Sequence, residues 1–260
     1  MKQILLSKWN QVGDLVRKTR SFFEDTLPPS EIHKKGPTDF VTETDYRVQN
    51  FLFNELSACW PEIQFMGEEK NNREIDFDGF YWILDPVDGT TNLIHRYQHS
   101  TVSLALAHGK TVLIGIIYNP DSDELFSAAL GKGAFLNGAP IHVSTTGSLG
   151  GSLISIGTSP YNHEYADWNF VKAKEVFLRC QDIRRLGSAA LELAYVACGR
   201  SDGMYEQRLY PWDYAAGLLL IQEAGGAATD FSGLLPDCSR PSSILATNGS
   251  IHQELMKLLE

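Results

Sequence analysis

Two aspartates, Asp85 and Asp88, follow an apolar segment at residues 81–84 that predicts a buried strand. Pro86 restricts the backbone between them, and Gly89 permits a turn directly after them. Acidic side chains are rarely buried unless something pairs with them, and a hard divalent cation is a common partner for several acids at once. This stretch therefore predicts a cation site at the end of a strand.

The residues that follow predict a place for phosphate. Gly89-Thr90-Thr91-Asn92 has the composition of a turn leading into a helix, whose first backbone N–H groups have no partner inside the helix and can bind an anion. A carboxylate and a phosphate charge about 5 Å apart repel each other by about 3 kcal/mol at an effective dielectric constant of about 20. Cations must therefore accompany a phosphate at this site.

Two further acids lie at the ends of predicted elements. Glu68 follows a short predicted strand, and Asp213 opens a predicted helix. A single Asp at a helix start is usually a cap, and capping also explains Thr44 and Asp45 at the start of an earlier helix. Glu68, Asp213 and the first pair of aspartates are together harder to explain as caps, and they favour one shared cation site.

The elements that would position these acids alternate between helices and strands. Apolar residues at helical spacing predict a first helix over residues 4–23, ending before Pro28-Pro29. Further helices are expected at 44–56, 168–177, 187–197 and 211–223, and strands at 61–66, 81–84, 102–106, 112–118, 153–156 and 204–206. This alternation predicts a mixed α+β, layered architecture.

The chain of 260 residues is long enough for one large domain. A segment rich in Ser, Thr and Gly at residues 144–151 is the best candidate for an internal boundary. We therefore expect one domain, residues 1–260, with two lobes at about 1–146 and 147–260.

Composition excludes several classes of protein. A net charge of −10 argues against binding to nucleic acid or to an anionic membrane, since both need clustered Lys and Arg. No apolar run reaches membrane-spanning length and the first eight residues lack a signal-peptide pattern, so a cytoplasmic protein is expected. The four cysteines show no C-x-x-C spacing, which indicates neither a zinc site nor a redox pair.

Other catalytic motifs are incomplete. Gly109-Lys110-Thr111 has the end of a phosphate-binding loop, but Leu104 stands at its first glycine. No G-x-S-x-G motif surrounds any serine, and His95 and His99 lack the Glu of a zinc-protease helix. The sequence therefore offers no motif for a protein nucleophile.

Four segments resemble the signature segments of one known family, the inositol monophosphatases, which are lithium-sensitive, Mg²⁺-dependent phosphatases. They are Gly67-Glu68-Glu69, residues 85–92, and Trp212-Asp213-Tyr214-Ala215-Ala216-Gly217 with Glu223-Ala224-Gly225-Gly226. The resemblance implies a layered αβαβα sandwich of the inositol monophosphatase and fructose-1,6-bisphosphatase type. It also implies a homodimer.

The resemblance further implies two to three Mg²⁺ ions. One ion would be bound by Glu68, Asp85 and the Val87 carbonyl, and a second by Asp85, Asp88 and Asp213. A weaker third ion would lie near Glu68. Two such ions would allow a water molecule to attack the phosphate without a protein nucleophile.

By the same resemblance, Thr90, oriented by Asp45, is similar to the pair that positions the attacking water, and Glu68 is a further catalytic residue. The implied substrate contacts are Asp88, Thr91 and the amides of Gly89 and Thr90 at the phosphate, Gly187, Ser188, Ala189 and Glu206 at the leaving alcohol, and Lys34 in a mobile loop.

The sequence departs from the animal members of this family near the expected substrate side. Tyr210-Pro211 precede Trp212 where those members usually have His-Cys, and Arg184, Arg185 and Arg208 add positive charge. These arginines either pair with surface acids or provide a site for a second phosphate, as on fructose 1,6-bisphosphate.

The expected function is that of a Mg²⁺-dependent phosphomonoesterase that converts myo-inositol 1-phosphate to myo-inositol and phosphate. Fructose 1,6-bisphosphate and 3′-phosphoadenosine 5′-phosphate are the alternative substrates. A non-catalytic, metal-binding regulator of the same fold is the alternative of another class, although Thr90 and Asp45 argue against it because a pure binder need not orient water.

Overall fold

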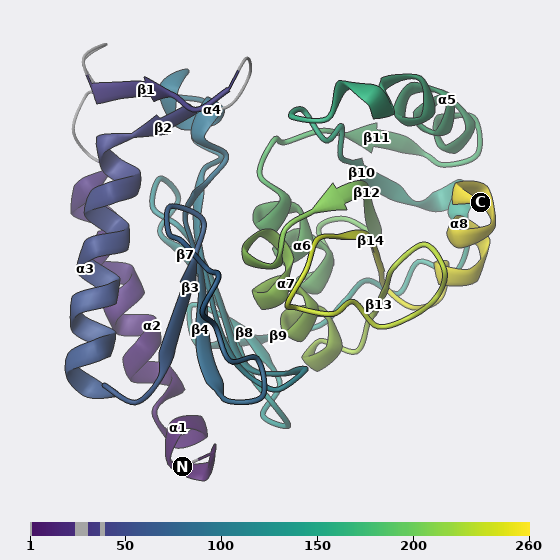
Figure 1. Cartoon of the computed structure of the whole chain (residues 1–260). Helices are drawn as coiled ribbons and strands as arrows, with labels where there is room; N and C mark the ends of the chain where they lie inside the picture. Colours follow the sequence, from purple (N-terminus) through teal and green to yellow (C-terminus); the bar gives the residue numbers. More distant parts are fainter. Residues whose placement is uncertain (1, 24–30, 37–39) are drawn as a thin grey trace.

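The computed structural model describes residues 2–23, 31–36 and 40–260. Within these residues two large mixed sheets are stacked with helices (Figure 1). The seven-stranded sheet has the order β3-β4-β5-β6-β7-β8-β9, with β3 parallel to β4 and the other pairs antiparallel. Its strands are β3 (Gln64–Gly67), β4 (Phe80–Asp88), β5 (Thr101–His108), β6 (Thr111–Asn119), β7 (Glu124–Ala129), β8 (Ala134–Leu136) and β9 (Ala139–Ile141).

The five-stranded sheet has the order β11-β10-β12-β14-β13, and a small pair, β1-β2, lies apart from both sheets. β10 is parallel to β11 and β12, whereas β14 is antiparallel to its two neighbours. These strands are β1 (Ile32–Lys34), β2 (Phe40–Thr42), β10 (Leu153–Ile156), β11 (Asp182–Arg184), β12 (Gly203–Leu209), β13 (Ala227–Thr229) and β14 (Ser242–Thr247).

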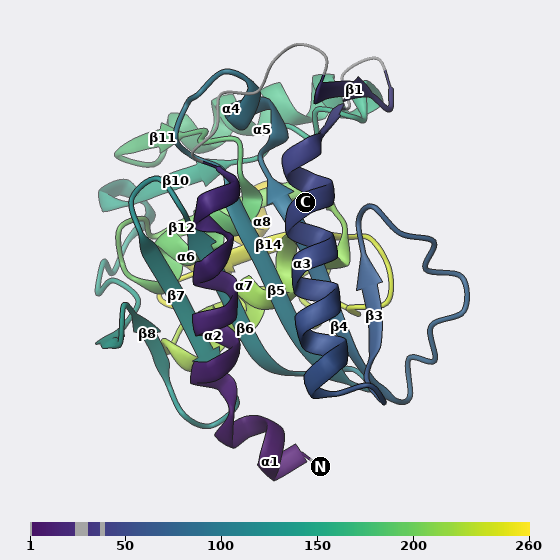
Figure 2. The same ribbon diagram turned by 90° about the vertical axis from the view of Figure 1, so that its left-hand side faces the viewer.

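The helices form three layers around the two large sheets (Figure 1). α2 (Trp9–Arg17) and α3 (Glu43–Cys59) cross one face of the seven-stranded sheet, as Figure 2 shows, and α1 (Lys2–Ser7) precedes them. α6 (Ala189–Ala197) and α7 (Pro211–Glu223) lie between the two sheets, and α5 (Ala166–Phe177) and α8 (His252–Leu259) cover the outer face of the five-stranded sheet. The expected αβαβα order is therefore confirmed.

Side chains along β4 point alternately to the two faces of the seven-stranded sheet, and each face is covered by a layer of helices. In β4, Trp82 and Leu84 point into the apolar core shared with α2 and α3, whereas Tyr81 and Ile83 point into the core shared with α6 and α7. Successive side chains of a strand face opposite sides, so a strand covered on both faces is apolar along its whole length. This accounts for the apolar run that precedes the two aspartates.

Glycines allow α7 to approach its neighbours closely. A Cβ on Gly115 of β6 would lie 2.6 Å from the Ala216 carbonyl oxygen, and a Cβ on Gly217 would lie 2.6 Å from the Leu193 side chain. Neither position has room for a larger residue. The close contacts fix α7, whose first turn carries Asp213, against both the sheet and α6.

Two expected helix limits were wrong. The segment expected as one helix from residue 4 is divided into α1, α2 and a 3₁₀ turn at Lys18–Phe22, and Pro28-Pro29 lie outside the described residues. The cap of α3 is Thr42 rather than Thr44 or Asp45. Asp45 instead lies in the first turn and accepts hydrogen bonds from the Thr42 backbone N–H and hydroxyl at 2.8 and 2.6 Å, because a carboxylate at this position can reach back to the cap.

The seven-stranded sheet ends at residue 141 and the five-stranded sheet begins at residue 153. However, α6 and α7, which follow residue 147, share one core with the first sheet. The division into lobes at residues 146 and 147 stays a prediction. In the described part of the chain, no helix has the length and apolar character needed to cross a membrane.

Candidate active site

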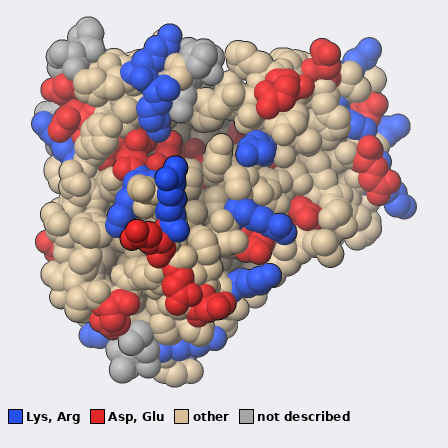
Figure 3. All heavy atoms as spheres, viewed as in Figure 1, with Lys and Arg blue, Asp and Glu red and all other residues tan. Residues whose placement is uncertain are grey.

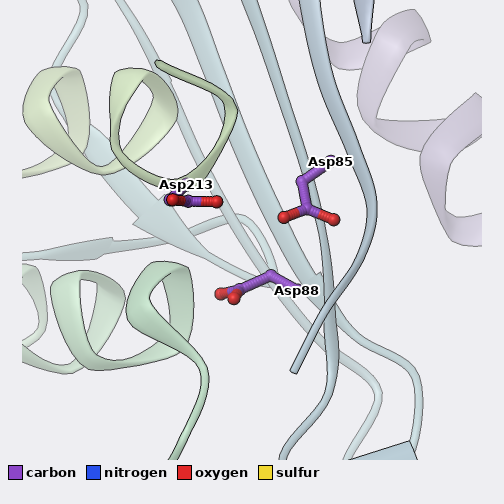
Figure 4. A group of neighbouring side chains, drawn as sticks. All are labelled: Asp85, Asp88 and Asp213. Atoms are coloured by element: carbon purple, nitrogen blue, oxygen red, sulfur yellow. The ribbon is translucent and has the colours of Figure 1, made fainter. Parts of the chain in front are cut away.

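Three aspartates meet in the structure: Asp85 and Asp88 from β4, and Asp213 from the first turn of α7. The pairing of β4 with β5 is irregular between Asp85 and Asp88, since three steps along β4 match only two along β5, from Ser103 to Thr101. This bulge turns both carboxylates toward the start of α7, where Asp213 points back at them (Figure 4). One oxygen from each of these three aspartates lies within 4.8 Å of the others.

Neighbouring groups hold each carboxylate in place. Asp85 Oδ1 accepts a hydrogen bond from the Val87 backbone N–H at 3.0 Å, and Asp213 Oδ2 accepts one from the Tyr210 N–H at 2.7 Å. Asp88 Oδ2 accepts hydrogen bonds from two groups at the start of α6, the Ser188 hydroxyl and the Ala190 N–H. Each aspartate therefore has a fixed position before any ion binds.

The three charges destabilise one another. Burial raises the pKa of Asp85 well above its usual value, and the charges of Glu68 and Asp88 raise it further. Burial and the Asp88 charge likewise raise the pKa of Asp213. Buried carboxylates that repel one another are the donor set that a hard divalent cation stabilises. The residues present therefore fit Mg²⁺.

Glu68 lies at the end of β3, beside β4, and faces the same cavity, but it is not one of the three clustered carboxylates. Its Oε1 accepts a hydrogen bond from Lys35 Nζ at 2.8 Å, and Lys35 also contacts Glu69 Oε1 at 2.5 Å. Lys34, the residue expected in this role, is exposed on β1, with its Nζ 6.0 Å from the centre of the Phe40 ring. The structure therefore brings Lys35, and not Lys34, to the cavity.

Thr90 and Asp45 lie next to each other, as expected. Thr90 Oγ1 donates a hydrogen bond to the Val87 carbonyl at 3.1 Å and lies 3.5 Å from Asp45 Oδ1. Burial raises the pKa of Asp45 to about 7, although two hydrogen bonds from Thr42 oppose the rise. A carboxyl group with this pKa can gain or lose a proton near neutral pH.

Gly89 joins β4 to the short helix α4 (Thr90–Ile94) in a left-handed conformation, with φ of 89°. A Cβ at this position would lie 3.1 Å from the Gly187 carbonyl oxygen and 3.2 Å from that of His99. Asn92 also connects these segments, because its Nδ2 donates hydrogen bonds to the His99 and Leu186 carbonyls at 3.0 and 2.9 Å. The turn after the aspartates is therefore tied to the loop before α6.

The start of α6 binds Asp88 directly. Ser188 is the N-cap of α6, and its Oγ accepts a hydrogen bond from the Leu191 N–H at 3.2 Å. The same hydroxyl donates to Asp88 Oδ2 at 2.7 Å, and the Ala190 N–H donates to that oxygen at 2.6 Å. These bonds join the end of β4 to a segment about one hundred residues later.

Two more buried acids, Glu206 and Glu192, border the cavity. Glu206 Oε1 accepts a hydrogen bond from the Ser159 N–H at 2.7 Å, and burial raises the pKa of Glu206 to about 7. Glu192 Oε1 accepts one from the Leu186 N–H at 2.6 Å, and burial raises its pKa to about 8. The sequence analysis did not identify Glu192 as a site residue. A signal was present, because Glu192 is the one charged residue in the small, apolar sequence of α6, which is typical of a buried helix.

The sites expected from the sequence converge on one cavity of about 500 Å³. All of the expected site residues line it except Asp45, which lies behind Thr90, and Lys34. Lys35, Ser159 and Gly157 also line it, without any signal in the sequence that would have found them. Figure 3 shows basic and acidic side chains interleaved over the face seen there, with no continuous basic stripe across it.

Comparisons with known proteins agree with this geometry. The sequence model of the inositol monophosphatase family matches residues 2–260. The chain is 39% identical to inositol-1-monophosphatase of Mesorhizobium japonicum over 230 residues, covering 88% of this chain and 86% of that protein. It is 37% identical to Nus factor SuhB of Escherichia coli strain K12 over 233 residues, covering 90% of this chain and 86% of that protein.

A solved structure is also similar along nearly the whole chain. The structure of SaIMPase-II with inositol monophosphate bound has a TM-score of 0.80 and 28% sequence identity. The match covers 97% of this chain and 92% of that one.

Proposed function

The chain belongs to the inositol monophosphatase family of phosphatases, and we propose that it is a Mg²⁺-dependent phosphomonoesterase acting on a small polyol phosphate. The observation that carries this proposal is the convergence of Asp85, Asp88 and Asp213, whose carboxylate oxygens lie within 4.8 Å of one another. Phosphate could approach this group of acids only together with cations.

The metal assignment is the one that the family resemblance implies, and the cluster of Asp85, Asp88 and Asp213 supports its second ion. Glu68, Asp85 and the Val87 carbonyl would hold one ion, and Asp85, Asp88 and Asp213 would hold a second, with a weaker third near Glu68. When bound, Mg²⁺ would lower the pKa of a water molecule and neutralise charge on the phosphate. For Glu68 to bind an ion, its hydrogen bond with Lys35 must give way.

The remaining residues of the site would position the reactants. The Thr90 hydroxyl would hold the attacking water, and Asp45 Oδ1 lies 3.5 Å from Thr90 Oγ1. Because burial raises the pKa of Asp45 to about 7, this carboxyl group can accept a proton near neutral pH. Thr91 and the amides of Gly89 and Thr90 bind the phosphate. The leaving alcohol would contact Gly187, Ser188, Ala189 and Glu206. Its hydroxyl groups can donate hydrogen bonds to the Glu206 carboxylate.

For the substrate, we propose myo-inositol 1-phosphate as the first compound to test. The inositol monophosphate in the SaIMPase-II structure supports this choice, since that protein is similar to this chain over almost its full length. Fructose 1,6-bisphosphate and 3′-phosphoadenosine 5′-phosphate are the alternatives. The test is phosphate release from this panel by the purified protein with Mg²⁺, with added Li⁺ and with chelator. Activity that persists in chelator would contradict the mechanism.

A regulatory role is the second candidate, because a relative with 37% identity is named Nus factor SuhB. In that case the protein would act by binding a partner through the same fold. Turnover by the purified protein alone distinguishes the two candidates, since a regulator without catalysis would release no phosphate from any compound of the panel.

We also propose that the protein is a cytoplasmic homodimer. Its α5 side exposes four apolar side chains on the surface of the single chain, namely Phe170, Val171, Phe177 and Leu178. Exposed large apolar side chains that gather on one part of a surface are typical of interaction sites. Light scattering should give twice the chain mass of 29.0 kDa.

A further inference from the structure

Three cationic side chains of the described residues line the cavity, namely Lys35, Arg185 and Arg208. Two of them are engaged by neighbours. Lys35 bridges Glu68 and Glu69, and the Arg208 guanidinium lies 5.7 Å from the centre of the Tyr210 ring, which is itself stacked on Trp212.

Arg185 contacts neither a carboxylate nor an aromatic ring among the described residues. Its Nη2 donates a hydrogen bond to Thr158 Oγ1 at 3.1 Å, and within the described part of the chain no acid lies within ion-pair distance of it. The adjacent Arg184 instead pairs with Asp182 on the same strand and donates to the Ile183 carbonyl at 2.7 Å. Of the three arginines noted in the sequence, Arg185 is therefore the one that lines the cavity without lying over an aromatic ring.

The position of Arg185 relates it to the leaving alcohol. Its Nη1 lies 2.3 Å from the place that a Cβ on Gly187 would occupy, so the guanidinium rests directly against Gly187. Its partner Thr158 lies between Gly157 and Ser159, which both contact Glu206. The guanidinium thus joins the two segments that border the proposed alcohol site.

Electrostatics give the same placement. Burial raises the pKa of both Asp88 and Glu206, and the positive charge of Arg185 opposes the rise in each of them. Arg185 therefore lies within electrostatic range of the metal-binding acids and of the alcohol side. A guanidinium has five N–H donors in a planar arrangement that matches phosphate or carboxylate, and the Thr158 contact uses only one of its two terminal nitrogens.

We propose that Arg185 binds a second anionic group on the leaving alcohol, so that the site prefers a polyol bisphosphate to the matching monophosphate. This inference rests on the proposed phosphatase function and specifies its substrate class. The reaction is ordinary phosphate ester hydrolysis: the water oxygen forms a bond to the reacting phosphorus, the P–O bond to the alcohol breaks, and the alcohol oxygen takes up a proton. The alcohol leaves with its second anionic group intact.

The test compares fructose 1,6-bisphosphate with fructose 1-phosphate, which differ only in the second phosphate. Initial rates of phosphate release give kcat/KM for both compounds in the wild-type protein, in Arg185→Gln, in Arg185→Lys and in the control Arg184→Gln. A charge-assisted contact of this kind is worth about tenfold or more in affinity. We expect the wild-type preference for the bisphosphate to fall about tenfold in Arg185→Gln, to recover in part in Arg185→Lys, and to stay unchanged in Arg184→Gln.

An unchanged ratio in Arg185→Gln would overturn the proposal, and so would an equal loss for both compounds, which would indicate a general electrostatic role. Calorimetric titration of the Mg²⁺-loaded proteins with both compounds in a Thr90→Ala background, which lacks the hydroxyl proposed to hold the attacking water, gives the same comparison without turnover. If the wild-type protein released phosphate from neither compound nor from myo-inositol 1-phosphate, the proposed function would fail. The affinity ratio in the wild type and in Arg185→Gln would then decide the anion site independently.

Discussion

Ser188 Oγ donates a hydrogen bond to Asp88 Oδ2 at 2.7 Å while accepting one from the Leu191 N–H at 3.2 Å. One hydroxyl therefore caps α6 and holds a proposed metal ligand. This atom is therefore the most direct place to test whether the stability of α6 and the geometry of the proposed metal site depend on each other.

Replacing Ser188 by Ala should lower both the stability of the protein and its affinity for Mg²⁺. Loss of an N-cap costs about 1 kcal/mol, and loss of a hydrogen bond to a metal ligand lowers metal affinity by about tenfold or more. We expect the Tm of the metal-free protein to fall by about 2–4 °C, and Mg²⁺ affinity, measured by calorimetry, to fall with it. Ser188→Thr retains the hydroxyl and is the control. Unchanged Mg²⁺ affinity in Ser188→Ala would show that Asp88 does not need this bond.

The Glu206 carboxylate occupies the space where a side chain at residue 157 would begin, because Gly157 has no Cβ. A Cβ at residue 157 would lie 2.2 Å from Glu206 Cδ, so Gly157→Ala must displace the carboxylate. Because misplacing a substrate contact by about 1 Å can cost about a hundredfold in rate, we expect a loss of that order in kcat/KM. Gly147→Ala is the matched control, since its Cβ would meet nothing within 4 Å.

The same substitution has a second readout. If Gly157→Ala acts through Glu206, it should cost little more in a background that already carries Glu206→Ala, because the two changes affect one contact. Additive losses would place the effect of residue 157 elsewhere in the cavity.

Asp213→Asn should separate activity from stability. The Asn side-chain oxygen can still accept the Tyr210 N–H bond, whereas the buried charge and its repulsion with Asp88 are removed. We expect activity to fall by about a thousandfold or more because a metal ligand is lost. The metal-free Tm should rise by about 2–4 °C for each kcal/mol of repulsion removed.

Exposed Glu62 provides the control for this variant, because Glu62→Gln removes a charge outside the site. Mg²⁺ should raise the Tm of wild type and Glu62→Gln, but raise that of Asp213→Asn much less. A full Mg²⁺ effect in Asp213→Asn would exclude this residue as a ligand.

Glu192 should make the metal-free protein less stable as pH rises. Burial raises its folded-state pKa from 4.5 to about 8, so the folded protein holds this proton more tightly than the unfolded chain. The stability associated with the neutral form is therefore complete below pH 4.5 and is lost progressively up to about pH 8. Glu192→Gln should remove this loss.

Denaturation in chelator at about pH 5.5 and about pH 8.5, on either side of the raised pKa, measures the effect. The difference in unfolding free energy between Glu192→Gln and wild type should be larger at the higher pH, where the Glu192→Gln variant should be the more stable protein. Glu62→Gln again serves as the control. If Glu192→Gln were less stable than the wild type at the higher pH, Arg185 would stabilise the ionised Glu192 carboxylate more than burial destabilises it.

Much of the layered fold could be predicted from the sequence because its signals are local. The apolar run before Asp85 and the helical pattern after Asp213 define buried elements, and each acid lies at the end of one. The choice of Lys35 over Lys34 could not be predicted, because both lie next to each other in a polar loop and only the direction of the backbone distinguishes them. The role of Gly157 was equally hidden, since it depends on Glu206 from a different strand.

Because α6 and α7 lie between the two sheets, the residues that line the cavity come from two halves of the molecule. Asp85 and Asp88 come from the seven-stranded sheet, whereas Glu206 and the segment at residues 157–159 come from the side of the five-stranded sheet. Under the proposed function, selection of the alcohol can thus change through substitutions in one half while the half with Asp85 and Asp88, two of the proposed metal ligands, keeps its geometry. A fold built this way can diversify its substrates without rebuilding its reaction centre.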